Sequence, residues 1–152
     1  MARYETSLSI PVPLALTFDY VSNFEHAGTW DPRVSAARRT DGDGPIGVGS
    51  RFELDSPGPL WTTIVFPYEI VQFERATHVV FEGQTSTASY RDDLRFEALS
   101  ETSTKLTYTA KFNLRGVLKI GSPIMAAFFQ RIGDDATQGI PDAVVKGTGW
   151  TP

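Results

Sequence analysis

Apolar and polar residues alternate in most segments between residues 4 and 115, and this pattern predicts a series of β-strands. The first alternating segment begins at Tyr4 and keeps Tyr, Thr, Leu and Ile side chains on one face up to Ile10. Pro11 and Pro13 follow, and proline cannot donate to a ladder. The first strand is therefore expected to end near Ile10.

Two short helices are predicted after this strand. Apolar residues recur at helical spacing from Leu14 to Val21, after a proline that suits the first position of a helix. Asn23 can cap the second helix. The residue before a proline is pushed out of the α region, so this helix is expected to stop at or before Asp31, which precedes Pro32.

Four further strand-like segments follow, separated by turn signals rich in Gly, Pro and Asp. They cover residues 34–39, 50–54, 61–73 and 78–82. Pro67 interrupts the third, and proline in a strand normally indicates a bulge, an edge or a break. Gly83 suggests a kink after the fourth. The glycines between residues 42 and 49 precede a strand and match no phosphate-binding pattern, so they are interpreted as turn residues.

The segments 86–99 and 105–115 alternate most regularly and predict a hairpin with one wet and one buried face. Matching the faces requires a register such as the one that pairs Glu97 with Lys105. The same register predicts three further pairs: Tyr90 with Phe112, Asp92 with Ala110, and Phe96 with Leu106.

A long apolar stripe near the end of the chain predicts one large helix. It begins after Ser122 and Pro123, with apolar residues at every fourth position from Ile124 to Ile140. Running to about Val145, this helix would be ~33 Å long and could cross a sheet. An interior proline at position 141 predicts a kink or a frayed turn near Gly139.

The composition excludes some partners and locations but indicates no particular reaction. The 152 residues are 41% hydrophobic and 21% charged with a formal net charge of −4, as expected for one domain over residues 1–146 and a tail over 147–152. The acidic balance argues against nucleic acid and against anionic membranes as partners. Cysteine is absent, and no apolar run approaches the ~18 residues of a membrane span. A cytoplasmic protein without membrane insertion is therefore predicted, and a homodimer is left open.

Short motifs along nearly the whole chain carry a resemblance that periodicity alone does not. The order and spacing of these motifs is similar to the polyketide cyclase/dehydrase and lipid-transport families of the START-like (SRPBCC) superfamily. They are Ser9 to Pro13 leading into a helix, Asn23-Phe24-Glu25, Trp30-Asp31-Pro32, Gly47 to Phe52, Leu94 to Glu97, Thr104 to Tyr108, and the helix after Arg115-Gly116.

The resemblance implies an α+β helix-grip fold, with a seven-stranded antiparallel sheet wrapped around the long C-terminal helix and two short helices after the first strand. Relatives hold lipids, polyketides, plant hormones or other hydrophobic molecules between sheet and helix. Some relatives catalyse cyclisation or dehydration, but fold alone transfers no activity. Three hypotheses follow: a binder of a small hydrophobic ligand, a cyclase/aromatase or dehydratase, and a regulatory protein-binding module whose cavity is collapsed.

Asp92 is the strongest candidate for a catalytic residue, and Tyr90 is the second candidate. The alternation that turns Tyr90 and Leu94 inward also turns this carboxylate inward. In an apolar cavity its pKa would rise, and it could act as a general acid or base on a ligand. A purely structural role, with the carboxylate turned outward or paired, is the alternative. The full set of predicted ligand contacts is Trp30, Tyr68, Phe81, Tyr90, Asp92, Phe96, Tyr108, Phe112, Ile124, Phe128 and Ile132.

Other chemistries find little support. His26 and His78 belong to no metal-binding motif, and both are expected on the surface, so neither a metal nor a cofactor is predicted. The Gly-x-Ser-x-Gly elbow of hydrolases is missing. Arg38 and Arg39 are interpreted as a solvated strand end, with an entrance cation for an acidic ligand as the alternative.

Overall fold

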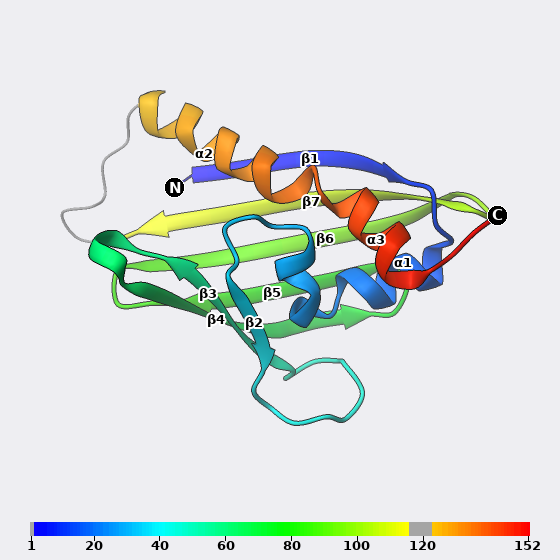
Figure 1. Ribbon diagram of the computed structural model, residues 1–152, viewed down its shortest axis with the longest axis horizontal. Coiled ribbons are helices and arrows are strands. Elements are labelled where there is room, and N and C mark those ends of the chain that lie inside the picture. Colours follow the sequence, from blue (N-terminus) through cyan, green and yellow to red (C-terminus); the bar gives the residue numbers. More distant parts are fainter. Residues whose placement is uncertain (1, 116–122) are drawn as a thin grey trace.

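The structure is a computed structural model that describes residues 2–115 and 123–152, with side chains from residue 130 onward in the second range. Within these residues seven antiparallel strands form one sheet in the order β1-β7-β6-β5-β4-β3-β2. Their bounds are β1 Ala2–Ile10, β2 Ala36–Arg39, β3 Arg51–Pro57, β4 Thr63–Glu74, β5 His78–Gln84, β6 Ala88–Ser100 and β7 Ser103–Leu114. The helices lie across one face of this curled sheet (Figure 1).

The helical elements are α1 Leu14–Val21, the 3-10 turns η1 Phe24–Thr29 and η2 Pro59–Trp61, and the C-terminal pair α2 Pro123–Thr137 and α3 Ile140–Thr148. The two helices predicted after the first strand are confirmed as α1 and η1. Asn23 caps η1 as expected, since its side chain accepts a hydrogen bond from the backbone N–H of Glu25 at 3.1 Å. The predicted cap Ser122 lies outside the described residues.

The predicted register of the last hairpin is confirmed. β6 and β7 pair Glu97 with Lys105, so the other expected pairs also form, including Asp92 opposite Ala110. The pairing of β1, β5 and β4 extends the pair of Asp92 and Ala110 into one cross-strand row. Its members are Tyr4, Ala110, Asp92, Phe81 and Ile70. Direct cross-strand partners share a face of a sheet, so these five side chains point the same way.

That row faces the C-terminal helix. The Tyr4 hydroxyl donates to Asp134 of α2 at 2.7 Å and lies 3.0 Å from the hydroxyl oxygen of Thr137. Gly133 permits this approach, because a Cβ there would strike the Tyr4 ring. The face carrying Tyr4 and Asp92, called the inner face below, is therefore the one that α2 covers, as in a helix-grip fold.

The C-terminal helix is broken where the proline predicted a kink. α2 ends at Thr137 and α3 begins at Ile140, with Pro141 in the first turn of α3, where its missing N–H costs little. Gly139 packs at the break, since a Cβ there would lie 2.6 Å from the carbonyl oxygen of Trp30. α3 reaches Thr148, so part of the predicted tail is helical, and Trp150 packs against the core.

Pro67 leaves β4 unbroken, and of the three predicted possibilities (a bulge, an edge or a break) it corresponds to the edge. β4 pairs with β5 only from Glu69 onward, so at Pro67 it is bonded to β3 alone and the missing N–H breaks no ladder. The irregularity comes later, as a bulge between Ile70 and Gln72. Gly83 lies inside β5, where a Cβ would strike the carbonyl oxygen of Pro67 and the ring of Tyr90.

The core fills the space between the inner face and α1, η1 and α3. Its side chains are almost wholly apolar; the largest fully buried ones include Phe18, Phe24, Phe52, Phe81, Ile70 and Leu106. Phe24 of η1 stacks on Phe81 with ring centroids 3.6 Å apart. Among the described residues no helix is long and apolar enough to cross a membrane.

Candidate functional site

Asp92 is a carboxylate buried on an otherwise apolar stretch of the inner face. Only 8% of it is exposed, and the Tyr108 hydroxyl donates to its Oδ2 atom at 2.6 Å. Within the described residues no basic side chain forms an ion pair with it. Burial raises the pKa of Asp92 to about 6, against a lowering by the Tyr108 bond and a further rise from the charge of Asp31. The outward-facing alternative for Asp92 is therefore wrong.

Trp30 packs its ring against Tyr108, the hydrogen-bond partner of Asp92, and carries a hydrogen-bond donor that no described residue uses. It ends η1, and its ring meets that of Tyr108 edge to face with centroids 6.3 Å apart. The residue is 6% exposed, and its Nε1 is buried without a hydrogen-bond partner among the described residues. Buried donors are normally satisfied by protein, water or ligand, so this N–H is suited to an acceptor on a bound molecule.

Two further tyrosines line the same face. Tyr68 on β4 is half-buried, and burial together with the charge of Asp92 raises its pKa well above the usual value. The Tyr90 hydroxyl donates to the carbonyl oxygen of Pro67 at 2.6 Å, in the gap left by Gly83. Burial, and then the charge of Asp92, likewise raises the pKa of Tyr90. Both phenols therefore remain protonated near neutral pH.

Asp31 is the residue of this site that sequence reasoning missed. It follows Trp30, accepts the backbone N–H of Arg33 at 2.9 Å, and has its pKa raised mainly by burial. Its charge acts on Asp92 and on Tyr108. Arg33 in turn pairs with Asp135 of α2 at 3.3 Å. The sequence Trp-Asp-Pro at this position is part of the family resemblance, but it gives no reason to place Asp31 in the site.

The other predicted contacts fall into separate groups. Phe81 and Phe96 are buried in core contacts beneath the small helices, with Phe96 edge-on to Phe18 at 4.9 Å. Phe112 is half-buried and stacks on Tyr90 at 6.1 Å. Ile132 is half-buried on α2. The predicted contacts Ile124 and Phe128 lie outside the residues whose side chains are described. The structure thus gathers Trp30, Tyr68, Tyr90, Asp92 and Tyr108 into one cluster.

The expectation that both histidines lie on the surface is wrong for His78. This residue is 6% exposed on the opposite, outer face of the sheet. Its Nε2 lies 2.9 Å from Asp93 and its Nδ1 lies 3.0 Å from the amide nitrogen of Gln72. Two neighbouring strands thus satisfy both ring nitrogens. His26 is half-buried, and its ring stacks on Tyr20 with centroids 4.1 Å apart.

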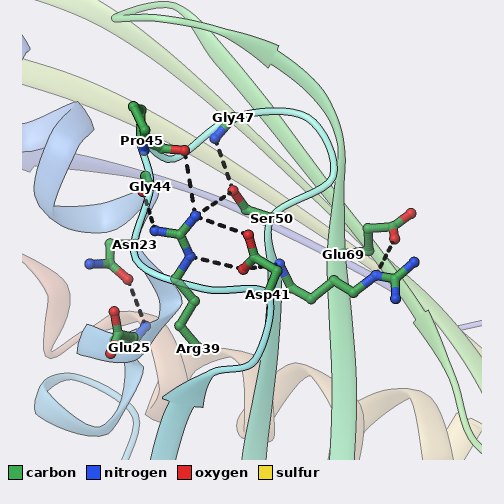
Figure 2. Close-up of polar contacts among 10 residues, drawn as sticks. Asn23, Glu25, Arg39, Asp41, Gly44, Pro45, Gly47, Ser50 and Glu69 are labelled. Atoms are coloured by element: carbon green, nitrogen blue, oxygen red, sulfur yellow. Dashed lines mark hydrogen bonds and ion pairs between the residues drawn. The ribbon is translucent and has the colours of Figure 1, made fainter.

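Arg39 is also not the solvated strand end that was predicted. Its side chain is 9% exposed, and its guanidinium holds both carboxylate oxygens of Asp41 at 2.8 and 3.0 Å. Further bonds reach the carbonyl of Gly44 and the hydroxyl of Ser50 (Figure 2). These bonds fasten the 40–50 loop and hold the pKa of Asp41 well below its usual value. Arg38 remains exposed and pairs with acidic residues of β3.

Among the described residues, no group of three or more His, Asp or Glu side chains is arranged to hold a metal ion. The cluster around Asp92 instead offers one carboxylate, protonated phenols and an indole N–H on an apolar face. This arrangement can accept a hydrogen bond from a ligand, donate one to it, or move a proton at a ligand atom.

A curled sheet gripped by a C-terminal helix, with a polar cluster on its covered face, defines a helix-grip protein. The chain belongs to the polyketide cyclase / dehydrase and lipid transport family, which its sequence matches over residues 1–144. A comparison with curated proteins finds no match.

Solved structures share the fold at low sequence identity. A START superfamily protein from Mycobacterium smegmatis has a TM-score of 0.75 at 13% identity, covering 96% of this chain and 99% of that one. The Zhui aromatase/cyclase from Streptomyces sp. R1128 has a TM-score of 0.71 at 12% identity, covering 97% and 93%. The di-domain ARO/CYC StfQ of steffimycin biosynthesis has a TM-score of 0.67 at 15% identity, covering 95% of this chain and 46% of that one.

Proposed function

We propose that this protein binds a small hydrophobic molecule, of lipid-, polyketide- or aromatic-like shape, between the inner face of its sheet and α2. The observation that carries the proposal is the polar cluster of Asp92, Tyr108 and Trp30 on an apolar face, with the indole N–H still without a partner among the described residues. Binding sites of this kind combine apolar walls with a few placed polar groups. Affinity would come mainly from burial of apolar area, at about 25 cal/mol per Å².

Filling the inner face tests the proposal. Ala110 lies directly opposite Asp92 and is partly exposed, so Ala110→Phe places a ring beside the cluster. Binding of the uncharged dye Nile red, followed by its fluorescence, is expected to weaken roughly tenfold or more in this variant, because the added ring occupies the site.

Thr109→Phe is the matched control. Thr109 is the neighbour of Ala110 on β7, but it pairs with Asp93 and its hydroxyl reaches Glu5 on the outer face. The same ring added there is expected to leave dye binding unchanged. Equal binding by both variants, or none by the native protein, would contradict the proposal and favour a collapsed regulatory module.

A second candidate function is acid–base catalysis of the cyclase or dehydratase kind. The observation that favours it is the pKa of Asp92, raised by burial to about 6, which suits proton transfer near neutral pH. Asp92 would take a proton from a carbon next to a carbonyl group. The indole N–H of Trp30, which has no partner among the described residues, would donate to the carbonyl oxygen, where negative charge develops. Turnover of a polyketide-like substrate that is lost in Asp92→Asn while dye binding persists would support this role.

A further inference from the structure

The charged side chains near Asp92 are mostly carboxylates. Asp92 lies on the inner face, and the charge of Asp31, on the segment after η1, already acts on it. From α2, Asp134 holds the Tyr4 hydroxyl and Asp135 acts on Asp31. Three elements thus bring negative charge to the same end of the covered face.

Among the described residues, the cations of this region do not offset the charge of Asp92. Arg33 has one buried guanidinium nitrogen, Nη1, without a hydrogen-bond partner, but Asp31 is the carboxylate on which its charge acts. Arg33 is bonded to Asp135 at 3.3 Å, and its charge offsets part of that of Asp31. Arg39 lies opposite Phe52 in the sheet. Its guanidinium donates hydrogen bonds to Asp41 and to the loop after β2 (Figure 2). In the part of the chain that the structure describes, no Lys, Arg or His forms an ion pair with Asp92.

This imbalance discriminates between ligands by charge. A buried anion beside Asp92 and Asp31 would lose its hydration and gain repulsion, and one neutral N–H from Trp30 offsets only part of that cost. An ammonium group or a hydroxyl group would instead be stabilised there, since it can donate a hydrogen bond to Asp92. Tyr108 uses one position on Oδ2, whereas a carboxylate can accept at about four positions.

We infer that the ligand is an uncharged or positively charged hydrophobic molecule whose hydroxyl or ammonium group donates to Asp92, and that hydrophobic carboxylates such as fatty-acid anions are excluded. This inference rests on the proposed binding function and adds the chemical class of the ligand. The N–H of Trp30 requires an acceptor, which a hydroxyl oxygen provides.

Displacement of Nile red by three molecules with the same decyl chain tests the inference. Decylammonium, decanol and decanoate differ only in their head group. The measurement is made at about pH 8, above the raised pKa of Asp92, so that this carboxylate is ionised. Decylammonium and decanol are then expected to displace the dye at concentrations at least about tenfold lower than decanoate. Equal or stronger displacement by decanoate would overturn the inference, as would failure of all three to displace a bound dye.

Two matched variants assign the effect to one carboxylate. Asp92→Asn is expected to reduce the preference for decylammonium over decanoate by about tenfold. Asp93→Asn removes the same charge from the next residue, which faces outward and contacts His78, and is expected to keep the native preference. An equal loss in both variants would contradict a local role for Asp92. Absence of dye binding to the native protein would instead contradict the proposed function itself.

Discussion

At the scale of single residues, Asp92 connects the site to stability. Its pKa rises on folding from 3.8 to about 6, mainly because the carboxylate is buried. The native state therefore holds this proton more tightly than the unfolded chain does. The resulting stabilisation is complete below about pH 4 and is lost as the pH rises through about 6. The shift corresponds to roughly 3 kcal/mol at most.

Asp92→Asn removes this dependence. We expect the variant to match or exceed the native protein in free energy of unfolding near pH 7, because the amide carries no buried charge and can still accept from Tyr108. The advantage should shrink as the pH falls toward about 4. Urea unfolding across this range measures the difference, with Asp93→Asn as the control for loss of one acidic charge. A difference between native protein and Asp92→Asn that does not vary with pH would refute the assignment.

Sequence patterns could predict the side of the sheet on which Asp92 lies and the nearness of Tyr108, but not the residues that approach from outside the hairpin. Strand alternation has a period of two, so the orientation follows from Tyr90 and Leu94 nearby. The hydrogen bond from Tyr108 also follows from the hairpin register. The approach of Trp30 and Asp31 depends instead on how η1 folds back over the sheet, which no local pattern encodes.

At the scale of elements, the hairpin between β3 and β4 departs from the usual turn chemistry. The carbonyl of Pro59 accepts the N–H of Thr62 at 3.1 Å around two residues with positive φ, Leu60 at 54° and Trp61 at 65°. Such a turn favours Asn-Gly, because side chains with a Cβ are strained at positive φ. Both side chains are also exposed, Leu60 at 90% and Trp61 at 101%.

Replacing this pair by the preferred residues should therefore stabilise the fold. Leu60→Asn combined with Trp61→Gly is expected to raise the free energy of unfolding by about 1–2 kcal/mol, through relief of backbone strain. The urea midpoint measures the gain. Leu99→Asn is the control, because it replaces an exposed leucine that lies on β6 and not in the turn. It should bring no gain in stability. A lower midpoint for the double variant would show that Leu60 and Trp61 make contacts that stabilise the protein.

The strands and helices also show where sequence reasoning fails. Pro67 left a bulge, an edge or a break open, and the edge applies because β5 begins to pair with β4 only two residues later. His78 and Arg39 were expected on the surface, but each is buried by polar partners from other segments. Cross-strand and loop contacts of this kind depend on sheet order, which composition and periodicity do not specify.

At the scale of the whole molecule, a buried phenol joins the first strand to the described part of α2. Tyr4 is 1% exposed, and its hydroxyl bonds with both Asp134 and Thr137. Tyr4→Phe keeps the ring against Gly133 but leaves these two partners short of one hydrogen bond. We expect a loss of about 1–2 kcal/mol of stability. We also expect faster hydrogen exchange in α2 and not in β6, because the layers separate locally before the sheet opens.

Tyr20→Phe is the matched control for this coupling. The Tyr20 hydroxyl bonds with Thr29 at 2.8 Å in an exposed contact between α1 and η1, away from α2. Exchange in α2 should therefore be native in that variant. If Tyr4→Phe accelerated exchange equally in β6 and α2, the helix and the sheet would open as one unit. A ligand between the layers would then need global unfolding to enter, and the proposed binding site would lack an independent route of access.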